Sequence, residues 1–406
     1  MLASLSIHNF KSLQNFQIEF PNKLCVLIGL NGSGKSTVLQ GIDFLTALTK
    51  KEGVSRWLAG RGWTKPDLFT SLSITPFSIL RRRRFSPVIT FSMVTELENV
   101  VSYKWEGMYN GNTGKCTKET IDWRDQNSGS DDRSIELSEG ILKNVGDNQF
   151  QPINLTPIDY QGSFLSVVKA ENPPYNCPPY DMRQHVESIL SIDLLSPLQM
   201  RRRVREFSMD GVGLGGEQLS LFLHSLSSDQ KHRLKEVMLR FYPHFDSFET
   251  VPMRGGWKKL TVKETYNASN LNTESRHLND GMLRILAIVA ETLFSKGTVL
   301  IDEIEDGINP EQLEKLTAYL LEDCPCQVIT TTHSPLLLNF IPDDNAKEIV
   351  QFVYKTAQGI SRAVPLFKIP KIAESLGMLG AGEVMLQYNM EDVACMAEKM
   401  NPSALK

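Results

Sequence analysis

Hydrophobic and polar positions alternate at the start of the chain and then change pattern twice. Residues 2–20, "LASLSIHNFKSLQNFQIEF", alternate as in a half-buried strand, and 23–29, "KLCVLIG", form a continuous apolar run. In 36–50, "STVLQGIDFLTALTK", the apolar residues recur at helical spacing. The pattern therefore predicts two strands, a glycine-rich loop and a helix.

The middle of the chain is more varied. Residues 86–123 contain alternating segments joined by Asn, Gly and Lys, which predicts a small antiparallel sheet. Residues 125–148 are polar and rich in Ser, Asp, Asn and Gly, so we expect an exposed loop. Residues 181–242 have mostly helical spacing.

The later part alternates apolar strands and amphipathic helices. A strand at 258–267 precedes the helical pattern "SRHLNDGMLRILAIVAETLF" at 275–294, and two further apolar strands, "TVLI" and "QVITT", enclose a helix at 309–322. This order is typical of a mostly parallel sheet covered by helices. We expect an α/β protein with a core at 1–60 and 246–368, a mixed β and helical insertion at 61–245, and a tail at 369–406.

Composition limits the functional classes. The chain has 406 residues, 41% of them hydrophobic, and a net charge of −4, which allows a large core and gives no bulk attraction to nucleic acid. Two local clusters, "RRRR" at 81–84 and "RRRVR" at 201–205, could contact DNA, or be a solvated face or internal ion-pair partners. The sequence shows no signal peptide or membrane-spanning run, so we expect a cytoplasmic protein with no membrane partner. Six scattered cysteines indicate neither a metal site nor a disulfide framework.

One motif predicts which ligand the protein binds. "GLNGSGKS" at 29–36 fits GxxxxGK[ST] at every fixed position and lies between a predicted strand and helix. Backbone N–H groups of such a loop surround the phosphates of ATP, the lysine neutralises phosphate oxygens, and the serine hydroxyl holds Mg²⁺. The expected ATP-binding residues are Asn31, Gly32, Ser33, Gly34, Lys35, Ser36 and Thr37.

Three polar residues at strand ends could complete the site. Asp302 and Glu303 follow the apolar run 299–301, where Asp302 can meet the metal's water shell and Glu303 can polarise the attacking water. His333 follows the next apolar strand, 31 residues after Asp302, and could donate a hydrogen bond to the γ-phosphate.

Together these motifs resemble the ABC-type ATPase heads of the RecF and SMC group, and more closely the single-chain AAA-family ATPases related to OLD nucleases. "IHNFKSLQNFQIEF" is similar to the approach to the phosphate loop in that group, "DEIEDGINPEQ" to its Walker B and D-loop with Asp306, and "TTTHSP" to its switch histidine. The resemblance implies a glutamine that contacts Mg²⁺ and the attacking water, and "DYQGSFLS" makes Gln161 the candidate.

The resemblance also implies a signature loop about 20 residues before Walker B. "LNDG", residues Leu278, Asn279, Asp280 and Gly281, ends 21 residues before Asp302 and has asparagine where serine is usual. Asn279 could contact phosphate, cap the following helix, or do both. Asp280 beside a triphosphate would need a cation such as Arg276 or Arg284.

In such heads the signature contacts ATP held by the opposite subunit, so the resemblance implies a homodimer around two ATP molecules. Only 73 residues follow His333, which leaves no room for a nuclease domain of the OLD type. We therefore expect a stand-alone ATPase that controls a separate nuclease or toxin, as in anti-phage defence. The methionine-rich tail after Lys368 is a possible partner surface, or packs on the core. The alternative is a RecF-like or SMC-like DNA-binding ATPase in repair or processing.

Overall fold

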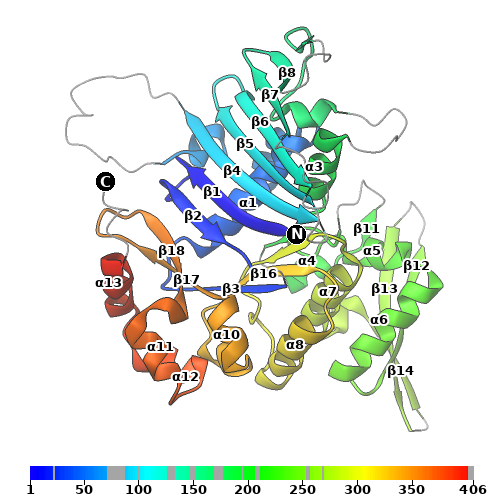
Figure 1. The fold of residues 1–406 in the computed structure, drawn as a ribbon. Coiled ribbons are helices and arrows are strands. Elements are labelled where there is room, and N and C mark those ends of the chain that lie inside the picture. Colours follow the sequence, from blue (N-terminus) through cyan, green and yellow to red (C-terminus); the bar gives the residue numbers. More distant parts are fainter. Residues whose placement is uncertain are drawn as a thin grey trace.

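Sheets and helices are layered in this chain (Figure 1). The description below comes from a computed structural model, which describes residues 1–21, 23–70, 87–97, 101–125, 133–145, 152–168, 177–193, 195–205, 211–252, 257–267 and 269–400. The first basic cluster, 81–84, lies outside these residues.

The central layer is a six-stranded sheet in the order β10-β15-β16-β3-β17-β18. Its first five strands are parallel and β18 is antiparallel to β17, which confirms the mostly parallel sheet. The strands are β3 (Leu24–Ile28), β10 (Leu190–Ile192), β15 (Thr298–Ile301), β16 (Gln327–Thr331), β17 (Val350–Lys355) and β18 (Ser361–Pro365). Every residue of β3, β15 and β16 is buried, because helices or another sheet cover both faces.

An eight-stranded antiparallel sheet forms an outer layer, in the order β2-β1-β4-β5-β6-β7-β8-β9. The strands are β1 (Leu2–His8), β2 (Phe16–Glu19), β4 (Val88–Leu97), β5 (Val101–Asn110), β6 (Lys115–Asp125), β7 (Arg133–Ser138), β8 (Ile141–Val145) and β9 (Ile153–Asn154). The prediction of a loop at 125–148 is wrong, since β7 and β8 lie there. Ile135 and Leu137 of β7 face the core, while Glu136 between them points to the other, less buried face.

Helix α1 (Lys35–Thr49) lies between these two sheets, beside α2 (Gly53–Arg61) and α3 (Pro178–Glu187). It is buried almost throughout because it contacts both sheets. One hydrophobic cluster joins Leu27 and Val353 of the central sheet, Phe44 of α1, and Ile7 and Trp105 of the antiparallel sheet.

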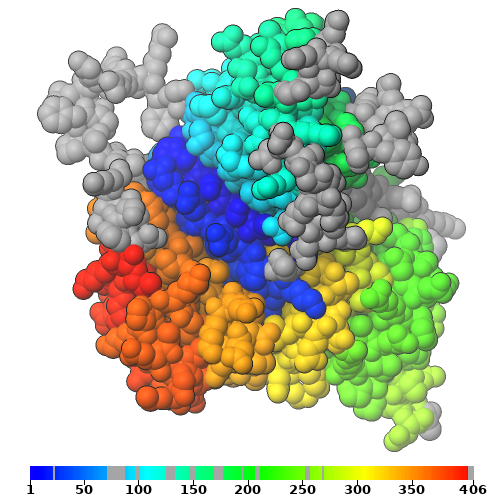
Figure 2. Space-filling view, viewed as in Figure 1, coloured from blue at the N-terminus to red at the C-terminus, as the bar shows by residue number. Residues whose placement is uncertain are grey.

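The opposite face of the central sheet is covered by α7 (Asp280–Phe294), α8 (Pro310–Glu322), α9 (Pro335–Asn339) and α10 (Asp343–Ile349). The helix predicted at 275–294 thus begins at Asp280, after a short 3-10 turn, and its apolar residues lie in the core. Figure 2 shows the N-terminal strands packed against these late segments.

A four-stranded sheet extends from one side of the core (Figure 1). It contains β11 (Val204–Arg205), β12 (Phe245–Pro252), β13 (Trp257–Tyr266) and β14 (Ser269–Glu274), with α4 (Pro197–Met200), α5 (Leu219–Ser225) and α6 (Ser228–Phe241) beside it. The segment 181–242 is therefore not purely helical, and its strand β10 belongs to the central sheet. β10 has only three residues, too few to show the alternation of polar and apolar positions that predicts a strand.

The tail consists of α11 (Pro370–Leu376), α12 (Ala381–Gln387) and α13 (Met390–Met400). Ile372, Val384 and Val393 are buried in the main core, so these helices pack back on the rest of the fold. Among the described residues, no helix combines the length and apolar character needed to traverse a bilayer.

Candidate functional site

The phosphate loop connects buried strand β3 to helix α1, and two of its glycines have no substitute. Gly29 and Gly34 have φ of 147° and 110°, and a Cβ would overlap the carbonyl oxygen of Val353 and the hydroxyl of Ser361, respectively. Ser361 of β18 also donates to the carbonyl of Ser33 at 2.7 Å. Strand β18 therefore supports the phosphate loop, although the two are far apart in the sequence.

The predicted ATP-binding residues follow in order along this loop. Asn31 and Gly32 are exposed at its crest, whereas Ser33 is buried and donates its backbone N–H to Leu30. Lys35, Ser36 and Thr37 form the first turn of α1, so the positive end of the helix faces the loop.

Lys35 is held inside the loop. Its Nζ donates to the carbonyls of Gly29 at 2.9 Å and Leu30 at 3.2 Å. Burial lowers the pKa of Lys35 to about 8, and the carboxylates of Asp302, Glu303 and Glu305 oppose that shift. The ammonium is still protonated at neutral pH, as phosphate binding requires.

Asp302 and Ser36 face each other across the site. The Ser36 hydroxyl donates to Asp302 Oδ1 at 3.1 Å, and Thr331 donates to the same oxygen at 2.5 Å. A hydroxyl from the first turn of α1 and a carboxylate from the end of β15 are oxygen donors of the kind that Mg²⁺ prefers. The residues predicted for metal binding at this point fit that ion.

Glu303 has an unusual backbone conformation, with φ of 50°. Its N–H donates to the Thr331 hydroxyl at 2.8 Å, which helps to hold the residue there. A non-glycine residue in the left-handed region is often found at functional sites, because the surrounding structure must compensate its cost of about 1–3 kcal/mol. The carboxylate is half-exposed and lies 3.6 Å from His333 Nε2.

His333 lies between the phosphate-loop lysine and Glu303. Its Nδ1 is 3.4 Å from Lys35 Nζ, and its backbone N–H donates to Glu305 Oε1 at 2.7 Å. The sheet brings these side chains together because β3, β15 and β16 are neighbours whose carboxyl ends share one edge.

The D-loop residue Asp306 lies next to the helix that follows the signature. Its Oδ2 forms a 2.7 Å ion pair with Arg284 of α7, and Gly281 at the start of α7 lies against the carbonyl of Gly307. The signature and the D-loop thus form one surface beside the Walker B strand.

Asn279 is the N-cap of α7. Its Oδ1 accepts the N–H of Met282 at 2.7 Å, and its Nδ2 has no hydrogen-bond partner among the described residues. The cap occupies only the oxygen, so the exposed amide N–H₂ can still donate to another group. Cap and phosphate contact are therefore compatible in one side chain.

Asp280 has a different cation from those expected. It pairs with Arg201, which also donates to the carbonyl of Leu278 at 2.7 Å. Arg276 pairs with Glu274 and Arg284 with Asp306, so neither neutralises Asp280. Arg201, the first residue of the second basic cluster at 201–205, therefore holds the predicted signature loop in place.

The position of Gln161 contradicts its predicted role. Its Oε1 accepts from Ser55 of α2 at 2.9 Å, and the next residues contact Leu48, near the end of α1. Lys35 lies at the other end of this 15-residue helix, about 20 Å away at 1.5 Å per residue. Gln161 is therefore not in the phosphate site of its own chain.

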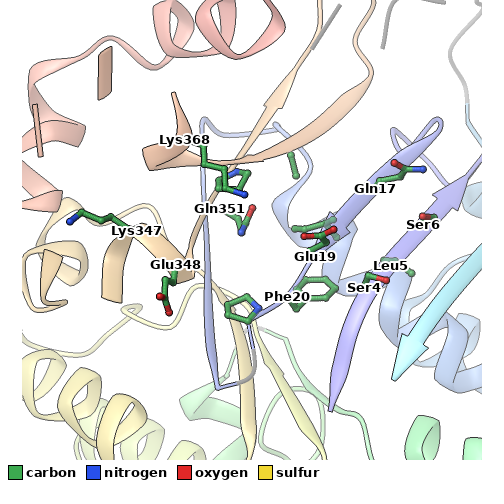
Figure 3. Close-up of a pocket in the computed structure, with 14 residues that line it drawn as sticks. Ser4, Leu5, Ser6, Gln17, Glu19, Phe20, Lys347, Glu348, Gln351 and Lys368 are labelled. Carbon is green, nitrogen blue, oxygen red and sulfur yellow. The ribbon is translucent and has the colours of Figure 1, made fainter. Parts of the chain in front are cut away.

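Other possible sites fall outside this constellation. The described cysteines are all free, and no group of three or more His, Cys, Asp or Glu among the described residues could enclose a metal. A groove of about 700 Å³ lies between β1, β2 and the segment from α10 to β18, and contains none of the predicted site residues (Figure 3).

The sequence did not point to three residues that organise the site. Thr331 joins Asp302 and Glu303, Ser361 supports the phosphate loop, and Arg201 holds the signature. Thr331 had a visible signal because it ends the apolar strand just before His333, and Arg201 begins a basic cluster whose residues could form internal ion pairs. The partners of Arg201 and Ser361 lie far away in the sequence, so the sequence did not indicate them.

Two family models match the chain. One, described as "AAA ATPase domain", matches residues 1–172, and the other, described as "AAA domain, putative AbiEii toxin, Type IV TA system", matches residues 195–339. The first range contains the phosphate loop, and the second contains the signature, Asp302, Glu303 and His333. No curated protein sequence matches the chain.

Solved structures of SMC heads are similar to the chain in fold. An SMC head bound to the C-winged helix domain of ScpA has a TM-score of 0.51 at 12% identity, over 89% of this chain and 96% of that chain. The SMC head domain from Thermotoga maritima has a TM-score of 0.46 at 12% identity, over 90% and 98%. The first of these supports the ABC-type head fold that the motifs predicted.

Proposed function

We propose that this chain, an AAA-type ATPase with the fold of an SMC head, binds and hydrolyses Mg²⁺–ATP and dimerises around it. One observation carries the proposal: Lys35, Asp302, Glu303 and His333 come from three different loops and meet at one sheet edge. Packing alone does not require an ammonium, two carboxylates and an imidazole at the same place.

Each residue has a distinct task in this proposal. The loop N–H groups and Lys35 bind the phosphates, and Ser36 and Asp302 hold Mg²⁺, which would neutralise phosphate charge when bound. Glu303 orients and polarises the attacking water. His333 donates from Nε2 to the γ-phosphate and so reports whether that phosphate is present.

The dimer follows from the signature. The described hydrogen bonds and ion pairs of 278–281 go to residues 201, 275, 282 and 283 and not to the phosphate loop. Asn279 and Asp280 are exposed, so they can contact a nucleotide on another copy. A head-to-tail pair would place two ATP molecules between two such surfaces.

Two variants test this function. Lys35→Ala should weaken ATP binding on the order of 100-fold or more, since it removes a buried charged contact, whereas Lys51→Ala in the loop after α1 should not. Glu303→Gln should keep ATP binding, lower kcat on the order of 100-fold or more, and accumulate an ATP-bound dimer measurable by light scattering. Normal hydrolysis by Glu303→Gln would refute the catalytic assignment.

We further propose that the ATP-bound dimer controls a separate nuclease or toxin in anti-phage defence. The toxin-system name of the matched family supports this idea, and two exposed apolar side chains of the tail are the candidate partner contact. Met378, in the turn after α11, is 88% exposed, and Leu386 of α12 is 71% exposed. A partner protein that covered both side chains would remove this apolar area from water.

The tail surface can be tested in the native host. The double variant Met378→Ser, Leu386→Ser should fold and hydrolyse ATP normally but lose a protein that copurifies with the wild-type chain. Leu198→Ser is the matched control, since Leu198 is also highly exposed but lies on α4. Retention of the partner by the double variant would exclude this surface.

The DNA-binding alternative has one structural support. Arg202, Arg203 and Arg205 are exposed and have no ion-pair partner within the described part of the chain. If they contact a duplex, the ATP-bound dimer should bind DNA with an affinity that falls steeply with salt, and Arg202→Ala, Arg203→Ala should reduce the slope. Absence of binding at low salt would remove this candidate.

A further inference from the structure

Glu305 is a carboxylate that the phosphate-binding and Walker B motifs do not require. It lies in the turn after β15, three residues beyond Asp302, and reaches across to the loop after β16. There its Oε1 accepts the backbone N–H of His333 at 2.7 Å. Glu305 thus ties the Walker B turn to the switch loop at the histidine itself.

This bond anchors the backbone of the residue that carries the imidazole. His333 Nδ1 is 3.4 Å from Lys35 Nζ, and His333 Nε2 is 3.6 Å from Glu303 Oε1. An ammonium has no lone pair, so Nδ1 must be the accepting nitrogen and a neutral ring carries its proton on Nε2. The N–H therefore points to the side of the ring where Glu303 lies.

The second oxygen of Glu305 makes its position costly. Oε2 is buried and has no hydrogen-bond partner among the described residues. A buried polar atom without a partner costs about 1–3 kcal/mol, and more for a charged group. A leucine or methionine could fill similar space without that cost, but could not accept the N–H of His333.

We propose that Glu305 is a positioning residue that holds His333 in register with the γ-phosphate. The inference rests on the proposed ATPase function, because it needs His333 to act on that phosphate. In this proposal, Glu305 acts through the backbone of the switch loop, where it accepts the N–H of His333. Its loss would allow the imidazole to move, and a shift of about 1 Å at a reacting centre can cost on the order of 100-fold in rate.

The experiment compares Glu305→Ala with Glu305→Gln. Alanine removes the acceptor, so kcat should fall on the order of 10- to 100-fold, with ATP binding changed less than about three-fold. Glutamine keeps an oxygen acceptor, so most of kcat should return. Glu311→Ala is the matched control, since Glu311 is an exposed carboxylate paired with Lys315 on α8.

A double-mutant cycle separates positioning from a general structural role. In a His333→Ala background, Glu305→Ala should cause little further loss of kcat, because the group that it positions is absent. Losses that multiply, or a main effect on ATP binding, would overturn the proposal. If Glu305→Ala does not fold, Glu305→Asp, which is too short to reach the N–H, replaces it in the cycle.

The proposed function fails in a different way. Unchanged hydrolysis in Lys35→Ala or Glu303→Gln would refute the ATPase site whatever Glu305 does. If those variants are inactive and His333→Ala has a reduced kcat, additivity with Glu305→Ala refutes only the positioning role.

Discussion

The two halves of the proposed ATP site differ in where their side chains find hydrogen-bond and ion-pair partners. In the first half, at the edge of the central sheet, Lys35 contacts His333, and Asp302 accepts from Ser36 and Thr331, so three loops are joined. In the second half, Asn279 caps its own helix and Asp280 pairs with Arg201, with both side chains exposed. In the proposed function, the first half binds phosphate within one chain, whereas the second would be completed by another copy.

The largest effect is expected when two variants are mixed, each of which is defective in a different half of the site. A Lys35→Ala chain keeps its signature, and an Asn279→Asp chain keeps its phosphate loop. If sites form between chains, half of the randomly paired dimers contain one intact site of two, so about a quarter of the ATPase activity should return. No recovery after mixing would show that both halves act within one chain.

The Asn279→Asp variant by itself tests whether the signature does more than cap its helix. Aspartate caps a helix as well as asparagine does, but it replaces the free amide N–H₂ with a negative oxygen. Folding stability should change by less than about 0.5 kcal/mol, while ATP-driven dimerisation weakens on the order of ten-fold or more. Thermal unfolding measures the folding stability, and light scattering measures the ATP-driven dimerisation.

Asn309 provides the matched control for that variant. It caps α8 through the same bond, with Oδ1 accepting from Gln312 N at 2.9 Å, but lies outside the signature. Asn309→Asp should leave dimerisation unchanged. Equal losses in the two variants would mean that Asn279 is only a cap.

Arg201→Ala should have a smaller effect on the same half. It removes the donor to the Leu278 carbonyl and the partner of Asp280, leaving an uncompensated carboxylate beside the incoming triphosphate. We expect dimerisation to weaken several-fold, corresponding to about 1 kcal/mol for a partly exposed pair. Arg240→Ala, which breaks the exposed pair with Asp323, should not affect dimerisation.

Gln161→Ala should have the smallest effect. The only side-chain bond described for Gln161 is from Ser55 on the surface, so kcat and ATP affinity should stay within about two-fold of wild type. A loss of ten-fold or more in steady-state hydrolysis would show that the segment moves to the active site during turnover.

The sequence predicted the first half of the site because its motifs are local. A glycine-rich loop, two carboxylates and a histidine each follow an apolar strand, and parallel strands bring such ends together. The sequence failed where the signal was short or distant. Three-residue β10 shows no period, and Arg201 lies 77 residues before Leu278.

Two other errors have physical explanations. The sequence of β7 does not resemble a strand because one face of the antiparallel sheet is solvated, so its polar residues outnumber its apolar ones; β8 has only five residues, too few for a clear alternation. Gln161 was placed by resemblance alone. The structure instead uses that loop to cover the end of α1, where the N–H of Ser163 donates to Leu48.

The central sheet places its earliest strand among its latest ones. β3 ends at Ile28 but pairs with β16 and β17, and the phosphate loop also needs Ser361 of β18. During synthesis at about 5–20 residues per second, the loop would be made many seconds before these neighbours emerge from the ribosome. If the proposed function holds, a nascent N-terminal segment would lack the strands that support its phosphate loop until β16, β17 and β18 have been made. An ATP-dependent dimer would then form only after these strands are in place, which would prevent partly translated chains from pairing.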